Sequence, residues 1–205
     1  MASTVTPTGH DHPEVSRLFG LRDDPARDLA RQAGAVARAC HAMAVRFHRG
    51  GKLIVFGTGG ASTDARHVAV EFVHPVIVGK RALPAISLTT DVATVTGIAE
   101  REGVDAIFAH QIRCLAEPAD IALGICARGD SPSVLAGLRA ARELGLLTIA
   151  LAGGGGPLPA DHVVTVDSQD PRVVKELQVT TYHILWELVH VFFEQPGVLD
   201  PGVVS

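Results

Sequence analysis

One stretch of the sequence, residues Lys52–Glu71, restricts the fold more than any other. Leu53–Phe56 form an unbroken apolar run, which is typical of a parallel strand buried on both faces. The glycine-rich turn Gly57–Gly60 follows, and Ser62 or Thr63 is expected to cap the helix after it. Free amides at such a turn, together with the dipole of the helix, point at one spot, so the stretch predicts an anion site.

The helix after this turn carries two polar side chains that suit chemistry. His67 and Glu71 are four residues apart and therefore lie on one face of the helix. Taken alone, they are better interpreted as a surface ion pair. Because an anion site lies within a few turns, they are also candidates for an acid, a base or metal ligands.

Short apolar strands alternate with helices along the rest of the chain. Further strands are expected at residues 84–88, 120–125, 146–151 and 162–166. Helices are expected at residues 91–100, 105–116, 132–144 and 171–194, with N-caps at Asp91, Ser131 and Asp170. A helical stripe from Leu29 to Phe47 precedes the first strand. The alternation predicts an α/β fold with three layers, αβα, around a five-stranded parallel sheet.

The domain organisation that we expect is simple. The chain has 205 residues, of which 47% are hydrophobic and 20% charged, enough for one well-packed domain. We expect a flexible N-terminal arm at residues 1–22, a single domain at 23–197 with an N-terminal oligomerisation helix, and a C-terminal tail at 198–205. His10 and His12 fall in the arm and are interpreted as part of a disordered segment rather than a metal site.

Charge and cysteine content exclude several classes of partner. The net charge of −4 lacks the excess of positive charge that is typical of proteins that bind nucleic acid. No apolar run approaches the roughly 20 residues of a membrane span, so no membrane partner is expected. The three cysteines form no CxxC pair, which argues against a disulfide framework and favours a cytoplasmic location.

A second polar turn, Cys126–Ser131, follows the third expected strand. Ligands bind to such sheets beyond the carboxyl ends of the strands, where both turns are expected to lie. The sequence therefore predicts a site for a phosphorylated small molecule. Its candidate binding residues are Thr58, Gly59, Gly60, Glu71, Cys126, Ala127, Arg128, Ser131 and Lys175.

The two turns and their flanking helices resemble the SIS (sugar isomerase) domain, and within that group the phosphoheptose isomerases. The similarity covers about residues 25–195, in order. The motifs that carry it are Gly57–Gly60, Asp64–Glu71, Pro84–Leu88 with Asp91, Gly129–Ser131 and His183. The resemblance implies a flavodoxin-like sheet and a homotetramer with active sites at subunit interfaces. It also implies conversion of sedoheptulose 7-phosphate to D-glycero-D-manno-heptose 7-phosphate or a related phosphosugar.

Aldose–ketose isomerisation moves a proton between adjacent carbons through an enediol. Glu71 suits the base and His183 the acid at the carbonyl oxygen, which makes them the candidate catalytic residues. The resemblance to zinc-containing members makes His67, Glu71 and His183 the candidate metal ligands. No cofactor is certain, and zinc is the candidate.

Several positions depart from the family pattern. Only Ser131 keeps a hydroxyl in the second turn, where Arg128 is a candidate replacement for the lost phosphate ligands. Thr58 replaces an asparagine, and Glu100 and Arg101 replace an Asn-Asp pair. Lys175 replaces a glutamine that is a metal ligand in zinc-containing members, and its charge is expected to oppose a cation. The alternative function is a non-catalytic SIS module that binds a phosphosugar or a protein partner.

Overall fold

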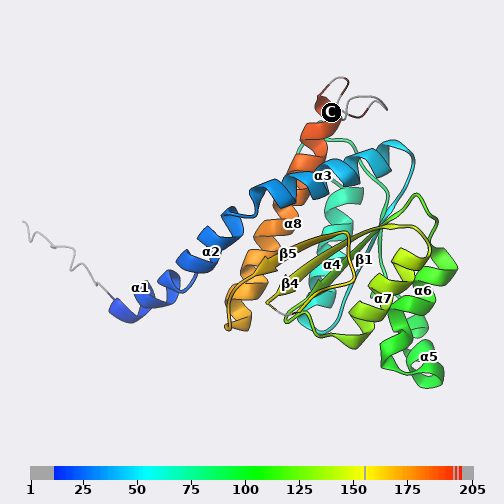
Figure 1. Ribbon diagram of the computed structural model, residues 1–205, viewed down its shortest axis with the longest axis horizontal. Coiled ribbons are helices and arrows are strands. Elements are labelled where there is room, and N and C mark those ends of the chain that lie inside the picture. Colours follow the sequence, from blue (N-terminus) through cyan, green and yellow to red (C-terminus); the bar gives the residue numbers. More distant parts are fainter. Residues whose placement is uncertain (1–11, 155, 196, 198, 200–205) are drawn as a thin grey trace, which may run out of the picture.

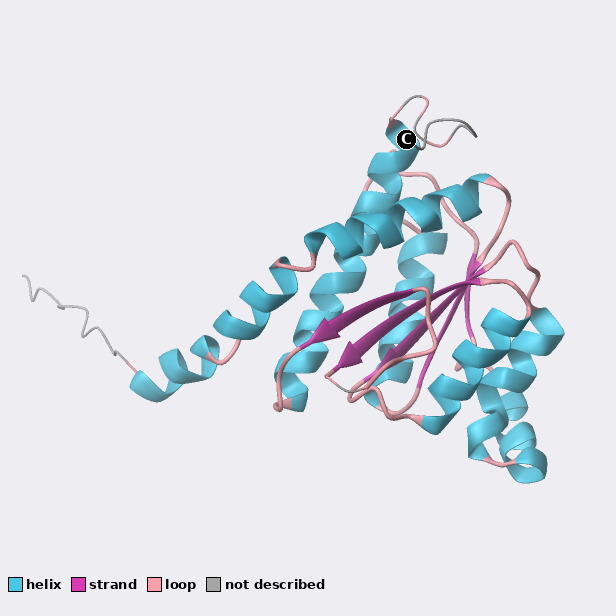
Figure 2. Cartoon of the chain, viewed as in Figure 1, coloured by secondary structure: helices cyan, strands magenta, loops and turns pink. Residues whose placement is uncertain are grey.

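The computed structural model describes residues 12–154, 156–195, 197 and 199. Its centre is a five-stranded sheet, drawn in magenta in Figure 2, in which all neighbouring strands are parallel. In spatial order the strands are β2 (Ala85–Ser87), β1 (Leu53–Gly57), β3 (Ile121–Cys126), β4 (Leu147–Gly153) and β5 (His162–Val166). The predicted three-layer α/β fold is confirmed. The order of strands changes direction between β1 and β3, so the loops that follow these two strands diverge and leave room for a ligand.

Helices cover both faces of the sheet (Figure 1). One face packs against α3 (Ala33–His48), α4 (Gly60–Val73) and α8 (Pro171–Glu194). The other packs against α5 (Val92–Glu102), α6 (Ile107–Leu115) and α7 (Pro132–Glu143), with a short 3₁₀ turn at Val104–Ala106 before α6. No helix in the described part of the chain combines the length and apolar composition needed to cross a bilayer.

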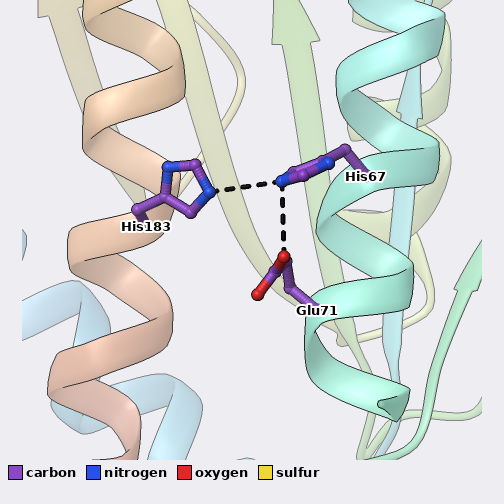
Figure 3. A group of neighbouring side chains, drawn as sticks. All are labelled: His67, Glu71 and His183. Carbon is purple, nitrogen blue, oxygen red and sulfur yellow. Dashed lines mark hydrogen bonds and ion pairs between the residues drawn. The ribbon is translucent and has the colours of Figure 1, made fainter. Parts of the chain in front are cut away.

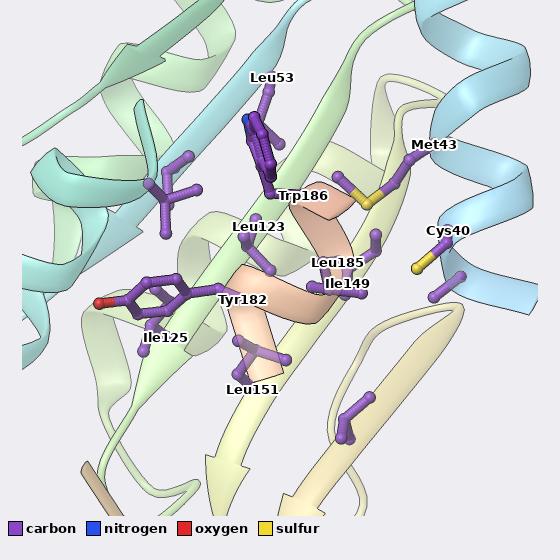
Figure 4. Close-up of a cluster of buried hydrophobic side chains, with 14 of the residues drawn as sticks. Cys40, Met43, Leu53, Leu123, Ile125, Ile149, Leu151, Tyr182, Leu185 and Trp186 are labelled. Atoms are coloured by element: carbon purple, nitrogen blue, oxygen red, sulfur yellow. The ribbon is translucent and has the colours of Figure 1, made fainter. Parts of the chain in front are cut away.

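The core between the sheet and α8 anchors the helix on which the site depends. Every residue of β1, β3 and β4 is buried, which explains their unbroken apolar runs. Figure 4 shows Leu123 and Ile149 of the sheet packed against Leu185 of α8. Met43 and Cys40 of α3 are fully buried beside them. These two residues, which belong to the helical stripe of the sequence, therefore serve core packing.

The predicted helical stripe at residues 29–47 is divided between two helices. It is interrupted after α2 (Asp23–Ala30), where Gln32 precedes α3. The side chain of Gln32 bonds the edge strand β5 in both directions: its Nε2 donates to the Thr165 carbonyl at 2.7 Å, and its Oε1 accepts from the Thr165 amide at 3.1 Å. The interruption therefore lets a side chain pair with an exposed sheet edge.

The predicted arm is described only from residue 12 onward; the rest of it, with His10, and most of the tail at 198–205 lie outside the described residues. Residues Pro13–Gly20 form a helix, α1, that extends away from the sheet and buries none of its side chains (Figure 1). The flexibility of the arm stays a prediction.

The predicted helix caps had mixed outcomes. Asp91 accepts hydrogen bonds from the Ala93 and Thr94 amides, and Asp170 accepts one from the Arg172 amide, as expected. Ser62 and Thr63 do not cap α4, which begins earlier, after Gly59. Their hydroxyls instead donate to the carbonyls three residues before them. Ser131 precedes α7 without a side-chain cap bond.

Candidate functional site

Three polar side chains from two helices meet on one side of the sheet (Figure 3). Nε2 of His67 lies 3.2 Å from Nε2 of His183 and 3.5 Å from a carboxylate oxygen of Glu71. The Glu71 side chain is 12% exposed and that of His67 45%. The cluster therefore joins a shielded carboxylate to two imidazoles that a ligand can reach. The sequence supplied these three residues, and the fold brings them together across 116 positions of chain.

Helices α4 and α8 run side by side in the same direction, and contacts along them hold the cluster. Lys175 meets Asp64 near the start of both helices, His183 meets His67 in the middle, and Trp186 meets Glu71 further on. The indole Nε1 of Trp186 donates to the main-chain carbonyl of Glu71 at 2.9 Å. This carbonyl belongs to the last turn of α4, where the helix itself supplies no partner. Trp186 therefore fixes the main chain from which Glu71 projects.

Lys175 is paired rather than free. Its Nζ lies 2.7 and 2.8 Å from the two carboxylate oxygens of Asp64, whose side chain is 7% exposed. The same Nζ lies 3.1 Å from the carbonyl oxygen of Gly60 in the first glycine turn. Asp64 therefore balances the charge of Lys175, and the expectation that Lys175 opposes a cation at the cluster stays a prediction.

The two predicted turns approach one another at the carboxyl ends of β1 and β3. The Thr58 and Ser131 hydroxyls are 3.3 Å apart, and the Ser131 hydroxyl lies at the same distance from that of Ser133. A Cβ at Gly57 would lie 2.7 Å from the Ile125 carbonyl oxygen, so only glycine permits this approach. A cavity of about 220 Å³ lies against Gly57, Thr58 and Gly59. Two helix N-termini and three hydroxyls thus gather at one place, an arrangement suited to an anion.

Arg128 takes a different position from the two hydroxyls. Its guanidinium pairs with Asp130 at 3.3 Å, and its side chain is 80% exposed. It lines a separate cavity of about 650 Å³ beside Gly154 and Ser168. Among the hydrogen bonds and ion pairs of the described residues, none links Arg128 to Thr58 or Ser131.

Other sequence-predicted residues also lie apart from the cluster. Glu100 and Arg101 are exposed on α5, on the opposite face of the sheet. Cys126 is buried at the end of β3, and burial raises the pKa of its thiol to about 11. Burial therefore favours a small structural residue at this position over a reactive thiolate.

The three clustered side chains fit a zinc ion. Two ligand atoms bound to tetrahedral zinc at about 2.0–2.1 Å are separated by roughly 3.3–3.4 Å. The two nearest pairs of ligand atoms in the cluster lie 3.2 and 3.5 Å apart. All three atoms lie within 4.8 Å of one another, and this is the one such group of three or more among the described residues. Two imidazoles and one carboxylate would leave a fourth position open for a ligand.

A groove of about 790 Å³ lies beside the cluster and is lined by His67, Arg66, Ser87 and Thr90. Its remaining wall is largely apolar and includes Val70 and Val73, which are 51% and 49% exposed. The volume falls within the range of small-molecule sites. His67 is therefore accessible from a space large enough for a sugar phosphate.

Sequence reasoning missed three residues that support the cluster: Asp64, Tyr182 and Trp186. Their helical spacing was the available signal, because Asp64 lies one turn before His67, while Tyr182 and Trp186 flank His183. From their spacing of four and seven residues after His183, Glu187 and His190 are expected on one solvated or interface face; this is wrong for His190. It is buried, with its ring nitrogens 2.8 and 2.9 Å from the Trp186 and Arg81 carbonyl oxygens.

Comparison with protein families and curated sequences gives consistent matches. Residues 26–153 match a family described as the SIS domain. A phosphoheptose isomerase of Solidesulfovibrio magneticus is 41% identical over 179 residues, which span 86% of this chain and 88% of that protein. One from Roseiflexus is 36% identical over 185 residues, which span 88% of this chain and 94% of that protein.

Solved structures give the same result. A phosphoheptose isomerase from Francisella tularensis superposes with a TM-score of 0.81 at 28% identity, covering 87% of this chain and 97% of that one. One from Neisseria gonorrhoeae gives a TM-score of 0.79 at 25% identity, covering 86% and 98%.

Proposed function

The chain belongs to the SIS domain family and, within it, to the phosphoheptose isomerases, and we propose that it interconverts sedoheptulose 7-phosphate, or a related ketose phosphate, with the corresponding aldose phosphate. It is a sugar-phosphate isomerase. The observation that carries the proposal is the meeting of Glu71, His67 and His183 between α4 and α8, beside a groove that His67 lines.

Glu71 and His183 divide the proton transfers. Glu71 removes a proton from C1 of the ketose while His183 donates a proton to the C2 oxygen, which gives the enediol. Glu71 then returns its proton to C2, and His183 takes the proton of the C1 oxygen, which gives the aldose. His67 lies within contact distance of both groups and holds them in relation to each other. Zinc, when held by these three residues, would polarise the substrate carbonyl.

The phosphate group binds at the two turns. The hydroxyls of Thr58 and Ser131 and the amides of Gly59 and Gly60 supply neutral donors, and the α4 and α7 dipoles favour an anion there. Lys175 contacts the sugar from the Gly60 side of the turn. Cys126, Ala127 and Arg128 contribute through the main chain of the second turn, because the Arg128 side chain lies against a separate cavity.

The replaced positions around the site make a related ketose phosphate a realistic alternative to sedoheptulose 7-phosphate. Thr58 stands in the first turn in place of an asparagine, and Lys175, in place of a glutamine, is already paired with Asp64. Such residues recognise hydroxyl groups differently from amide side chains, which offer both a donor and an acceptor. The substrate is therefore tested as a panel rather than as one compound.

A homotetramer with active sites at subunit interfaces completes the proposal, with the enzyme in the cytoplasm. Exposed apolar side chains continue from the outer face of α4 into the loop after it: Val70, Val73, Val76, Ile77 and Val78 are each at least 49% exposed. Apolar patches of this kind mark protein contacts. The patch adjoins the groove that His67 lines, so a second subunit there would help to enclose the site.

The test is an isomerase assay on a panel of ketose and aldose phosphates that includes sedoheptulose 7-phosphate. Wild type is expected to be active, and Glu71→Gln and His183→Ala are each expected to lose about 1,000-fold in kcat. Glu187→Gln is the matched control, because Glu187 is exposed on the same helix one turn from His183. If wild type and both site variants are equally inactive on every sugar, yet a phosphosugar still binds, the chain is a binding module. Metal analysis of the purified protein tests zinc separately.

A further inference from the structure

Tyr182 is the single tyrosine of the chain, and its ring lies against both histidines of the cluster. The ring centroids of Tyr182 and His183 are 4.8 Å apart, and those of Tyr182 and His67 are 5.7 Å apart. The side chain thus reaches from α8 across to His67 on α4, and Figure 4 shows its ring beside Ile125 of the sheet. Its position brings a third polar group to the side chains that carry the proposed proton transfers.

The hydroxyl of Tyr182 is the part of this side chain that remains available. The residue is 4% exposed, and no hydrogen bond joins its hydroxyl to any described residue. Every buried side-chain oxygen and nitrogen in the described part of the chain has a hydrogen-bond partner. Because the Tyr182 hydroxyl has none, it must be partly exposed to solvent, and it can therefore bond to a ligand.

The Tyr182 hydroxyl acts as a donor rather than as a base. An ordinary phenol has a pKa of about 10 and therefore keeps its proton at neutral pH. A protonated phenol can donate one hydrogen bond to an oxygen of a bound sugar.

Resting on the proposed isomerisation, we propose that Tyr182 is a further catalytic residue, whose hydroxyl donates a hydrogen bond to the substrate oxygen that His183 is not contacting at that step. The enediol carries oxygens on two adjacent carbons, and the imidazole of His183 serves them one after the other, so one of the two lacks this partner at each stage. The phenol keeps its proton throughout, so the balance of proton transfers between Glu71 and His183 is unchanged. A fixed donor at developing negative charge lowers the barrier without itself being rearranged.

A packing role alone would not need the hydroxyl. The ring fills the space between the sheet and the histidines, and phenylalanine would fill it equally well. The packing role and the catalytic role therefore differ only in whether the hydroxyl oxygen is needed. Tyr182→Phe removes that atom and retains the ring contacts with His67 and His183.

The experiment compares Tyr182→Phe with wild type on the sugar phosphate that wild type isomerises fastest. We expect kcat to fall about 100-fold, the loss typical of one oxyanion donor, with KM within twofold and an unchanged melting temperature. Thr180→Val is the control, because it removes an exposed hydroxyl two residues away whose bond is to the Glu176 carbonyl. A Tyr182→Phe enzyme with wild-type kcat overturns the inference, even while Glu71→Gln is inactive and the proposed function stands.

A second readout does not depend on turnover. Tyr182 is the only tyrosine, and its spectrum is separated from the overlapping band of Trp186 by subtracting the same titration of a protein that also carries Tyr182→Phe. Adding sedoheptulose 7-phosphate to the Glu71→Gln protein is expected to shift the tyrosine band, because the hydroxyl acquires a bond to the sugar. A band that does not move while binding is detected by calorimetry overturns the inference. Inactivity of wild type on the whole panel would overturn the proposed function and this inference together. A tyrosine shift in that case would show that the hydroxyl contacts a bound sugar but takes no part in a reaction.

Discussion

The two halves of the site are held in different ways. In the helix half, His67, Glu71 and His183 project from α4 and α8, which are tied by the Trp186 bond to Glu71 and by the Lys175–Asp64 pair. In the turn half, residues 57–60 and 126–131, hydroxyls approach no closer than 3.3 Å and the charged side chain of Arg128 is 80% exposed. The helix half is fixed before a ligand arrives, whereas the turn half depends more on the ligand itself.

This difference suggests which part of the site can vary. Proton transfer demands atoms at fixed positions, so a displacement of one ångström is costly. An anion, in contrast, can be bound by many combinations of amides, hydroxyls and cations. Of the departures, Thr58 and Arg128 fall in the turn half and Lys175 in the helix half, where it pairs with Asp64. We therefore expect the reaction to depend on Glu71 and His183, and the choice of substrate to depend mainly on the turn half.

The sharpest test shortens one side chain in each half. Glu71→Asp withdraws the carboxylate by one methylene and is expected to lower kcat about 100-fold with little change in KM. Ser131→Ala removes one hydroxyl from the turn half and is expected to raise KM about tenfold with little change in kcat. Steady-state kinetics on the same sugar phosphate measure both. Equal effects on kcat in the two variants would remove the distinction between the halves.

Removal of the Lys175 ammonium tests how the start of the helix half is held. Lys175→Met leaves the buried Asp64 carboxylate without its partner and is expected to lower the free energy of unfolding by about 2 kcal/mol. Urea denaturation followed by the fluorescence of Trp186, the single tryptophan, measures the loss. The double variant Asp64→Asn with Lys175→Met should recover much of it. An unchanged unfolding midpoint in the single variant would mean that solvent replaces the ammonium without cost.

The sequence predicted the sheet, His67 and Glu71 through local signals, and His183 through the family resemblance. Apolar runs such as Leu53–Phe56 identify strands, and the spacing of His67 and Glu71 identifies a shared helix face. The contacts between α4 and α8 have no such signal. Whether Lys175 meets Asp64 or a bound cation depends on how two helices, far apart in sequence, are aligned. The break at Gln32 was missed for the same reason, since its partner is Thr165 on another element.

A smaller effect is expected at the other end of the helix half. Trp186→Phe keeps an aromatic ring in the core but removes the N–H that bonds the Glu71 carbonyl. The end of α4 is then less firmly placed, and kcat is expected to fall several-fold while KM stays within twofold. Because one neutral hydrogen bond is lost, the free energy of unfolding should fall by about 1 kcal/mol. A stability loss without any change in kcat would show that the bond supports the core and not the position of Glu71.

The smallest effect is expected at Cys126, which lies in the turn half but takes no part in proton transfer. Burial raises the pKa of its thiol to about 11, so the reactive thiolate is scarce at pH 8 and becomes abundant only as the pH rises toward 11. Iodoacetamide at pH 8, followed by peptide mass spectrometry, should modify exposed Cys114 rapidly and both Cys126 and buried Cys40 slowly. Cys126→Ser should keep kcat within twofold. The opposite result would be labelling of Cys126 as fast as Cys114, or a tenfold loss of kcat in the serine variant. Either would place a reactive group in the turn half, which could then no longer be assigned to substrate binding alone.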